Sequence, residues 1–175
     1  DQKLVLALGR LHRNKAFDML IRALPRLTGT HVVIAGDGPE RADLLDVARR
    51  EGVADRLHLA GWRQDTGALL AAADALACPS RHEPLGNVVI EAWSAGRPVV
   101  AAASEGPSEL MTPDDGILVP PEDPAALADA LGRVMGDPAW AASLTLAGRR
   151  RFEDEFAEAP VVARWREFLG AVEQA

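Results

Sequence analysis

Short apolar runs alternate with longer segments of helical periodicity along most of this 175-residue chain. Each run is four or five residues long, rich in Val, Leu, Ile and Ala, and most are followed directly by glycine or proline. A strand without polar alternation is buried on both faces, which is typical of a parallel sheet covered by helices on both sides. The runs lie at residues 4–8, 31–35, 57–60, 75–78, 99–102 and 116–119.

Strand and helix alternate in this way through the first two thirds of the chain. The rhythm predicts an α/β fold with a single doubly wound, Rossmann-like parallel sheet of about six strands and helices on both faces. Residues 1–175 are therefore expected to form one domain. Ligands of such sheets bind beyond the carboxyl ends of the strands. The loops at residues 9–15, 36–39, 61–63 and 80–87 lie at this edge.

Prolines and acidic residues predict where several helices begin or weaken. Pro39 is well placed as the first residue of the second helix, where proline loses no hydrogen bond. Asp65 can cap a short third helix. Asp123-Pro124 is a cap followed by a first-turn proline and predicts the start of a later helix. Pro25 is expected to kink or shorten the last turn of the first helix.

Composition and charge narrow the class of protein. The net charge of −7 argues against a surface that binds nucleic acid wholesale. No apolar run approaches ~18 residues, so no membrane span is expected, and the start of the chain does not resemble a signal peptide. The single cysteine, Cys78, excludes an internal disulfide framework and fits a reducing, cytoplasmic compartment. The chain opens Asp1-Gln2-Lys3 without an initiator methionine, so we expect a piece of a longer polypeptide.

The stretch 81–93 passes from a loop into a helix and carries two carboxylates, Glu83 and Glu91. Its helical part has apolar residues in nearly every direction around the axis, which predicts a buried helix. The N-terminus of that helix can bind an anion. A buried Glu91 is either neutralised by an arginine such as Arg97 or accepts hydrogen bonds from two adjacent hydroxyls of a ribose. Buried charge pairs are costly, which favours the ribose.

Three basic residues, Arg10, Arg13 and Lys15, crowd the loop after the first strand. Clustered charges of one sign repel each other, so a bound anion such as a phosphate is a natural reason to keep them. The alternative is a solvated loop with scattered salt bridges. The basic run 149–151 is interpreted as an exposed helix, because acidic residues follow three and four positions later.

Other residues near the ligand-binding edge allow more than one interpretation. Gly36 and Gly38 form a lone G-x-G, which is weak evidence for NAD and reflects either a tight turn or the close approach of a ligand. Trp62 could stack on a base, but packing over the sheet edge is favoured. His82 is expected to face solvent, and Cys78 to be a small core residue. No cysteine–histidine spacing suggests zinc and no Asp-x-Asp pair follows a strand, so no metal site is predicted.

Taken together, these motifs resemble the nucleotide-sugar-binding, C-terminal domain of retaining GT-B glycosyltransferases of group 1. Residues 9–18 resemble the family's G-R-x-x-x-x-K-G-x-D element, with Ala16 where glycine is common. The most specific motif is E-x7-E, formed by Glu83 and Glu91, although Asn87 stands where an apolar residue is frequent. The resemblance covers essentially the whole chain. The further matches are Ala35–Pro39, Pro79–Arg81, Glu83–Gly86, Gly96–Val100 and Gly116–Val119.

The resemblance implies a role for each of these residues. Arg10 and Lys15 would bind the diphosphate of a nucleotide-sugar donor and stabilise it as it leaves, and Glu83 would bind hydroxyls of the transferred sugar. These three are the implied catalytic residues, while Glu91 would hold the ribose. The other implied donor-binding residues are Gly9, Gly36, Gly38, Leu85, Arg63 through its backbone, and Gly86, Asn87 and Val88 through their amides.

The implied function is donor binding in an enzyme that moves a sugar from a nucleoside-diphosphate sugar to an acceptor. The family resemblance implies retention of configuration, and no metal or cofactor is expected. The base, the sugar and the acceptor stay open. Two alternatives also stay open: a nucleotide-sugar epimerase of the same fold, for which no acid–base residues are identified, and a non-catalytic nucleotide-binding module.

In the family that the chain resembles, the acceptor site lies on a separate N-terminal α/β domain, which we expect to be absent from this chain. The isolated chain is therefore expected to bind donor without transferring sugar, and peripheral membrane association is expected only through the full-length protein. A terminal helix of the family packs on the N-terminal domain, and an apolar stripe near the end of this chain has the spacing of such a helix. The stripe consists of Val161, Val162, Trp165, Phe168, Leu169 and Val172.

Overall fold

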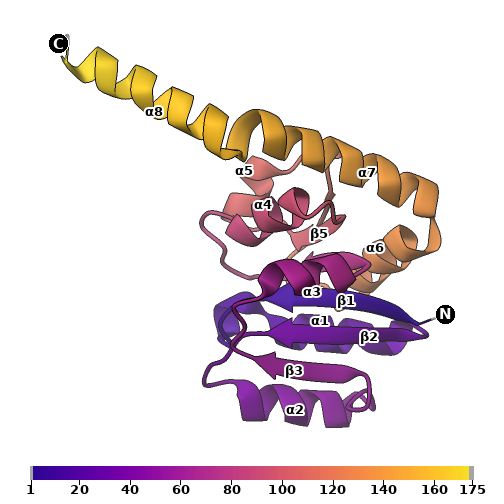
Figure 1. Ribbon diagram of the computed structural model, residues 1–175. Coiled ribbons are helices and arrows are strands. Elements are labelled where there is room, and N and C mark those ends of the chain that lie inside the picture. The colour runs from indigo at the N-terminus through magenta and orange to yellow at the C-terminus, as the bar shows by residue number, and fades with distance from the viewer. Residues whose placement is uncertain (1, 174–175) are drawn as a thin grey trace.

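Six parallel strands form one sheet in the order β3-β2-β1-β4-β5-β6 in the computed structural model, which describes residues 2–173 (Figure 1). Every strand agrees with a predicted run to within one residue at each end, so the predicted doubly wound α/β fold is confirmed. The strands are β1 (Lys3–Leu8), β2 (Thr30–Ala35), β3 (Leu57–Gly61), β4 (Ala75–Cys78), β5 (Val99–Ala102) and β6 (Ile117–Val119).

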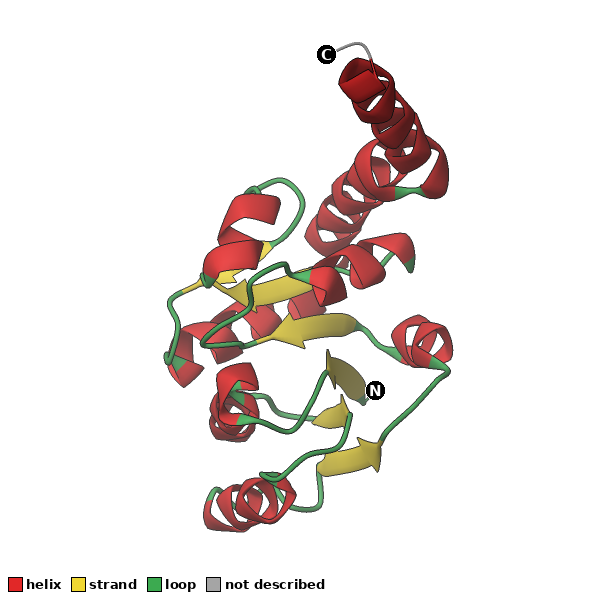
Figure 2. Ribbon diagram, turned by 90° about the vertical axis from the view of Figure 1, so that its left-hand side faces the viewer, coloured by secondary structure: helices red, strands yellow, loops and turns green. Residues whose placement is uncertain are grey.

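Helices cover both faces of this sheet (Figure 2). One face is covered by α1, α2 and α6, and the other by α3 and α4, with α7 packed against α4. The helices are α1 (Phe17–Ala23), α2 (Arg41–Arg50), α3 (Thr66–Ala72), α4 (Asn87–Ser94), α5 (Glu105–Leu110), α6 (Pro124–Gly136), α7 (Pro138–Arg151) and α8 (Glu158–Glu173). Three tighter or wider turns are η1 (Arg13–Lys15), η2 (Leu24–Arg26) and the π-helical η3 (Phe152–Phe156).

Two hydrophobic cores flank the sheet because successive side chains of a strand point to opposite faces. On β1, Val5 belongs to the core under α1 and α6, and Leu6 to the core under α3 and α4. The largest side chain of the second core is Trp93 of α4, whose indole N–H donates to the Asp115 carbonyl at 3.0 Å. Burial of one such large apolar side chain contributes about 1.5–3 kcal/mol to stability.

The strand order reverses direction between β1 and β4, which are paired neighbours in the centre of the sheet. From β1 the chain moves outward through β2 to β3, and from β4 it moves the other way through β5 to β6. The loops after β1 and β4 therefore leave the same edge of the sheet and lead to helices on opposite faces, which is where ligands of doubly wound sheets bind. This topological switch point positions the candidate site.

Several predicted helix boundaries need correction, and others are confirmed. Pro25 lies in η2, directly after α1 ends at Ala23, as expected. Asp123 caps α6 by accepting a 2.9 Å hydrogen bond from the Ala126 amide. Pro39, by contrast, lies in a turn, and α2 begins two residues later at Arg41. Asp65 precedes α3 but does not cap it with its side chain.

The prediction that residues 88–95 form a helix buried all round is wrong. Only Val89, Ala92 and Trp93 of α4 are buried, while Val88 and Ile90 are half-buried. The helix buries one face against the sheet and α7 and leaves its other face toward the crevice edge. Glu91 lies on the uncovered side and is exposed, so the prediction of a buried carboxylate there is also wrong.

The last third of the chain wraps over α4 and then leaves the body of the molecule. The predicted helical ion pairs are present, since Arg149 contacts Glu153 at 2.7 Å and Arg151 contacts Glu155 at 3.2 Å. Arg151 is not merely solvated, because it also pairs with the buried Asp115 at 2.9 Å. Beyond this point α8 projects away from the sheet (Figure 1). No helix within residues 2–173 has the length and apolar character needed to cross a membrane.

Candidate functional site

Two loops at the switch point make up the centre of the candidate site. The first follows β1 and contains η1, and the second runs from Pro79 to Gly86 between β4 and α4. Their backbones are joined directly: the amide of Arg81 donates to the Asn14 carbonyl at 2.8 Å, and the amide of His82 donates to the same oxygen at 3.3 Å. The side chains of both loops are therefore held in one place.

Lys15 and Glu83 form an ion pair across these loops, through the lysine Nζ and the glutamate Oε2. The Ser80 hydroxyl also lies 3.4 Å from Oε2. Glu83 is only 7% exposed, and no residue in the described part of the chain donates to its second oxygen, Oε1. The structure thus joins two residues to which the family resemblance gives separate roles, and it leaves one carboxylate oxygen able to accept a hydrogen bond.

The turn 36–38 packs against the backbone of the first loop. A Cβ atom at Gly36 would lie 1.8 Å from the carbonyl oxygen of Gly9, and one at Gly38 would lie 2.4 Å from that of Leu11. The Leu11 amide donates to the Asp37 carbonyl at 3.0 Å. Glycine is therefore required at both positions because two backbones lie in contact there. This contact explains the two glycines without a tight turn or the close approach of a ligand.

Gly9 and Arg10 begin the first loop. A Cβ atom at Gly9, whose φ is +142°, would lie 3.2 Å from the Cε atom of Lys15, so the lysine stem crosses the open face of this glycine. Arg10 is exposed, and none of the ion pairs among residues 2–173 uses its guanidinium. The Arg10 charge remains available to a ligand, whereas the Lys15 charge is shared with Glu83.

The second loop ends at the N-terminus of α4, where Gly86 occupies the cap position with φ +72°. A Cβ atom there would lie 2.8 Å from Cδ1 of Leu110, so both conformation and packing favour glycine. Among the described residues no acceptor meets the amides of Gly86, Asn87 or Val88. Free amides at the start of a helix attract anions, because the helix dipole adds a partial positive charge.

Glu91 lies one turn further along α4, on the same side as Asn87 and Val88. Partial desolvation raises the pKa of its carboxyl group. Arg97 does not neutralise Glu91, because its guanidinium donates to the Ala71 carbonyl at 2.9 Å. The carboxylate is therefore accessible at the rim of the crevice.

Residues that the sequence reasoning missed hold the second loop in position. Glu105, the first residue of α5, accepts hydrogen bonds from the Glu83 amide at 3.3 Å and from His82 Nδ1 at 2.6 Å. The Gly106 amide donates to the Glu83 carbonyl at 2.7 Å. The pKa of Glu105 is lowered, chiefly by its own backbone N–H and then by the hydrogen bond from His82. His82 faces solvent as expected, but it also has this acidic partner.

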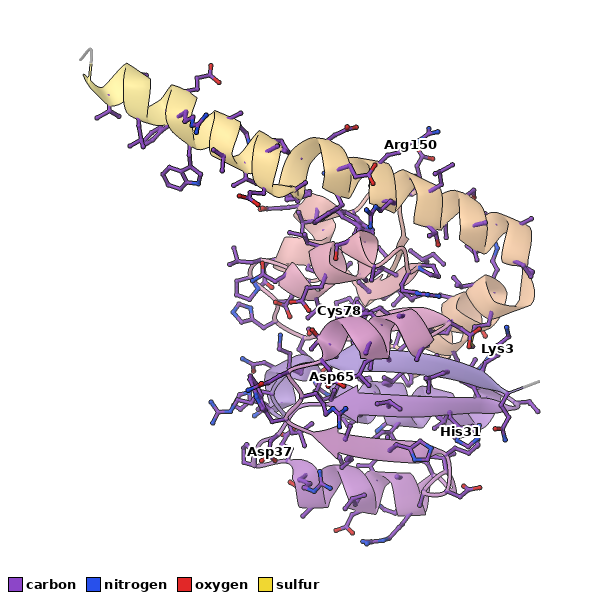
Figure 3. The ribbon with its side chains drawn as sticks, viewed as in Figure 1. Lys3, His31, Asp37, Asp65, Cys78 and Arg150 are labelled. Carbon is purple, nitrogen blue, oxygen red and sulfur yellow. The ribbon has the colours of Figure 1, made fainter. Side chains whose placement is uncertain are left out.

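Trp62, Arg63 and Asp65 follow β3 at the same edge. Trp62 is 78% exposed, so the expected packing over the sheet edge is wrong. The Arg63 guanidinium donates to both carboxylate oxygens of Asp65, at 2.8 and 2.6 Å, which raises the pKa of Arg63 and lowers that of Asp65. Asp37 and Asp65 mark this carboxyl edge, and Lys3 lies at the opposite edge (Figure 3).

The arrangement is suited to a ligand with two kinds of group. Arg10, Lys15 and the free amides at the start of α4 can bind an anion, while Glu83 Oε1 and Glu91 can accept hydrogen bonds from hydroxyls. Within residues 2–173, no three His, Cys, Asp or Glu side chains gather closely enough to hold a metal ion.

Comparisons with known proteins show which family the chain resembles. Residues 2–137 match the family described as "Glycosyl transferases group 1". The chain is 38% identical over 159 residues to the lipopolysaccharide core biosynthesis glycosyltransferase LpsD of Rhizobium meliloti, a match that covers 90% of this chain and 46% of LpsD. The chain spans about half the length of LpsD and of LpsE, a second lipopolysaccharide core biosynthesis glycosyltransferase of the same organism.

Solved structures show the same fold. The crystal structure of Anabaena HepE in complex with UDP and glucose has a TM-score of 0.91 and 28% identity, and the match covers 97% of this chain and 48% of HepE. The crystal structure of the C-terminal domain of a group 1 family protein from Francisella tularensis has a TM-score of 0.79 at 19% identity. That match covers 89% of this chain and 87% of the other, and it shows likeness of fold alone.

Proposed function

This chain belongs to the group 1 glycosyltransferases, as their C-terminal GT-B domain, and we propose that its task is to bind the nucleoside-diphosphate-sugar donor. The observation that carries the proposal is the meeting, at the switch point, of basic side chains, unpaired helix amides and a buried carboxylate with one free oxygen. The likeness to HepE, whose crystal structure contains UDP and glucose, supports it.

Each part of the site takes one part of the donor in this proposal. The amides of Gly86, Asn87 and Val88 bind the distal phosphate, and Arg10 and Lys15 neutralise the diphosphate from the other side. The remaining implied donor-binding residues bind the sugar, the ribose and the base, or form the surface around these groups. Glu83 Oε1 accepts from sugar hydroxyls, Glu91 accepts from the ribose, Arg63 lies against the base through its backbone, and Gly9, Gly36, Gly38 and Leu85 shape the crevice.

The chemistry follows from this distribution of charge. Cleavage of the bond between the anomeric carbon and phosphate develops positive charge on the sugar and negative charge on the leaving diphosphate. Preorganised cations and amides stabilise the second charge, and each such contact supplies ~3 kcal/mol. Arg10 and Lys15 deliver the positive charge that a metal ion would otherwise provide, so we propose transfer without a metal, with the retention of configuration implied by the family.

Lys15 has a second task in this mechanism. In the structure its ammonium group pairs with Glu83, so an incoming diphosphate competes for it. When Lys15 turns toward the phosphates, the Glu83 carboxylate loses one donor and accepts the sugar hydroxyls instead. The ion pair thus keeps a buried carboxylate compensated until the donor arrives, because an unpaired buried charge is costly.

The acceptor would bind to a second domain, which we place against the apolar face of α8. The side chains of Trp165 and Phe168 are each 59% exposed, and Leu169 is 54% exposed. Because the chain spans about half the length of its relatives, an N-terminal domain of similar size is the proposed partner of this face.

Calorimetric titration with UDP, GDP and ADP tests the proposal. At least one of these should bind the wild-type chain, and Arg10→Ala should weaken that binding about ten- to hundred-fold, since a charge-assisted contact contributes about 1.5–3 kcal/mol. Arg26→Ala is the control, because Arg26 is an exposed arginine beyond the far end of α1. EDTA should leave the affinity unchanged. Absence of binding by every diphosphate would favour a module unrelated to nucleotides.

A further inference from the structure

The side chain of Arg81 connects three separate loops at the carboxyl edge of the sheet. Its guanidinium donates to both carboxylate oxygens of Asp18, each at 2.9 Å, and to the Arg13 carbonyl at 2.7 Å. Its Nε also pairs with Glu122, which follows β6. One side chain thus gathers the chain segments that follow β1, β4 and β6.

These contacts surround Lys15 without including it. Arg13 and Asn14 are the two residues before Lys15, and Asp18 lies three residues after it in the first turn of α1. On the other side, Arg81 is two residues from Glu83, the ion-pair partner of Lys15. Arg81 therefore holds both backbones that carry this ion pair, although its own guanidinium contacts neither charged group.

The loop that Arg81 holds contains a conformation that needs an outside restraint. Ala16 has φ +50° and ψ +36°, the left-handed conformation that is unfavourable for alanine. No side chain caps α1, which begins at the next residue. Without the side-chain contacts to Asp18 and to the Arg13 carbonyl, the backbone from Arg13 to Asp18 could relax toward a more favourable conformation and carry Lys15 with it.

The chemistry of the contacts requires arginine. A guanidinium has five N–H donors in a planar fork, so it can contact a carboxylate with two bonds and still reach a carbonyl and a second carboxylate. A lysine in the same place would supply one point charge and could not span these acceptors. Arg81 and Asp18 are about equally protected, with side chains 24% and 25% exposed.

We propose that Arg81 is a positioning residue for donor binding: it holds the backbones that carry Lys15 and Glu83 where the diphosphate and sugar require them. This inference depends on the proposed function. A positioning role can be distinguished from general stabilisation of the fold. A residue that acts through Lys15 should lose its influence on affinity when Lys15 is removed, whereas a residue that only stabilises the fold should not.

A double-mutant cycle with Lys15 tests this distinction. We expect Arg81→Met to weaken binding of the diphosphate that the wild type prefers by about tenfold or more. We expect Arg81→Lys to rescue little of that loss, and Asp18→Asn to reproduce part of it. In the Lys15→Met background, the further loss from Arg81→Met should be less than about twofold, since interacting sites are non-additive.

Arg151→Met is the matched control for loss of stability. Arg151 is similarly protected, with a side chain 23% exposed, and it contacts buried Asp115, Glu155 and the Leu110 carbonyl, none of which belongs to the two loops of the site. Its removal should lower the melting temperature and leave nucleotide affinity unchanged. If Arg81→Met does not fold, Arg81→Lys and Asp18→Asn carry the same cycle.

The outcomes separate the two proposals. Wild-type affinity in the Arg81 variants, or an equal loss with and without Lys15, would overturn the positioning role while donor binding stands. Failure of the wild-type chain to bind any of UDP, GDP and ADP would overturn both.

Discussion

Glu91 is the residue whose charge state should make donor binding depend on pH. Partial desolvation raises its pKa, so it becomes protonated at a higher pH than an ordinary glutamate, whose pKa is about 4.3. A protonated carboxyl group accepts hydroxyl hydrogen bonds less well. Affinity for the preferred diphosphate should therefore fall as pH is lowered from neutral through the raised pKa.

The Glu91→Gln variant provides the comparison, because glutamine is nearly isosteric and does not titrate. Its affinity should be lower at neutral pH and should lose this part of the pH dependence in a calorimetric titration. The stability of the wild type should change with pH in the opposite direction from its affinity. A raised pKa disfavours the folded state at pH values above that pKa, so the wild type gains stability as the pH falls through it, and the variant does not. If the affinities of the wild type and the variant depended on pH in the same way, the ribose-binding role of Glu91 would be contradicted.

At this scale the sequence located residues better than it located their environments. The neighbourhood of Lys15 and Glu83 followed from the rule that strand ends share one edge of a parallel sheet. Their direct ion pair did not, because it depends on side-chain conformation. Arg81 belongs to the matched motif Pro79–Arg81, but the sequence did not indicate its contacts, since its partners are as far as 68 residues away along the chain. The exposure of Glu91 contradicts the argument from hydrophobic pattern, which describes a helix and not the elements around it.

At the scale of elements, strands were predictable and helix surroundings were not. Short apolar runs, most of them followed by glycine or proline, predicted the parallel strands closely: both ends of all six strands agree within one residue, although the edge strands β3 and β6 are only partly buried. The pattern of α4 suggested burial all round, yet Val88 and Ile90 remain half-buried. An apolar surface can be buried, but whether it is buried depends on which other elements pack against it.

The helix α8 leads to a prediction at this scale. It packs mainly against η3, and its apolar side chains are largely exposed, so it contributes little to the core. A chain ending after Ala157 should unfold within a few degrees of the full chain and should bind the same diphosphate with the same affinity. Scanning calorimetry and titration measure both, with Trp93→Ala as a destabilising comparison expected to cost about 3–5 kcal/mol. A truncated chain that does not fold would show that α8 is part of this domain's own core.

At the level of the whole molecule, the proposed function assigns the donor to this chain and the acceptor to a second domain. Residues 2–173 build a single six-stranded sheet, and the curated relatives are about twice as long. We therefore expect the 175-residue chain to bind donor and to transfer no sugar, because acceptor positioning contributes several kcal/mol to the barrier reduction. A transfer assay with a broad acceptor panel checks this. Turnover near that of an ordinary enzyme, ~1 s⁻¹ or faster, would show that the domain is catalytically complete.

The central claim, that a donor diphosphate binds between the loop after β1 and the start of α4, is tested most directly by amide NMR. The ¹⁵N-labelled chain would be titrated in turn with UDP, GDP and ADP, and the resonances of Gly86, Asn87 and Val88 followed. At least one diphosphate should shift these amides strongly and saturably, together with those from Gly9 to Lys15, and should leave the α8 resonances unchanged. If a diphosphate binds but its shifts lie elsewhere, or if no diphosphate shifts these amides, the site described here is not the donor site.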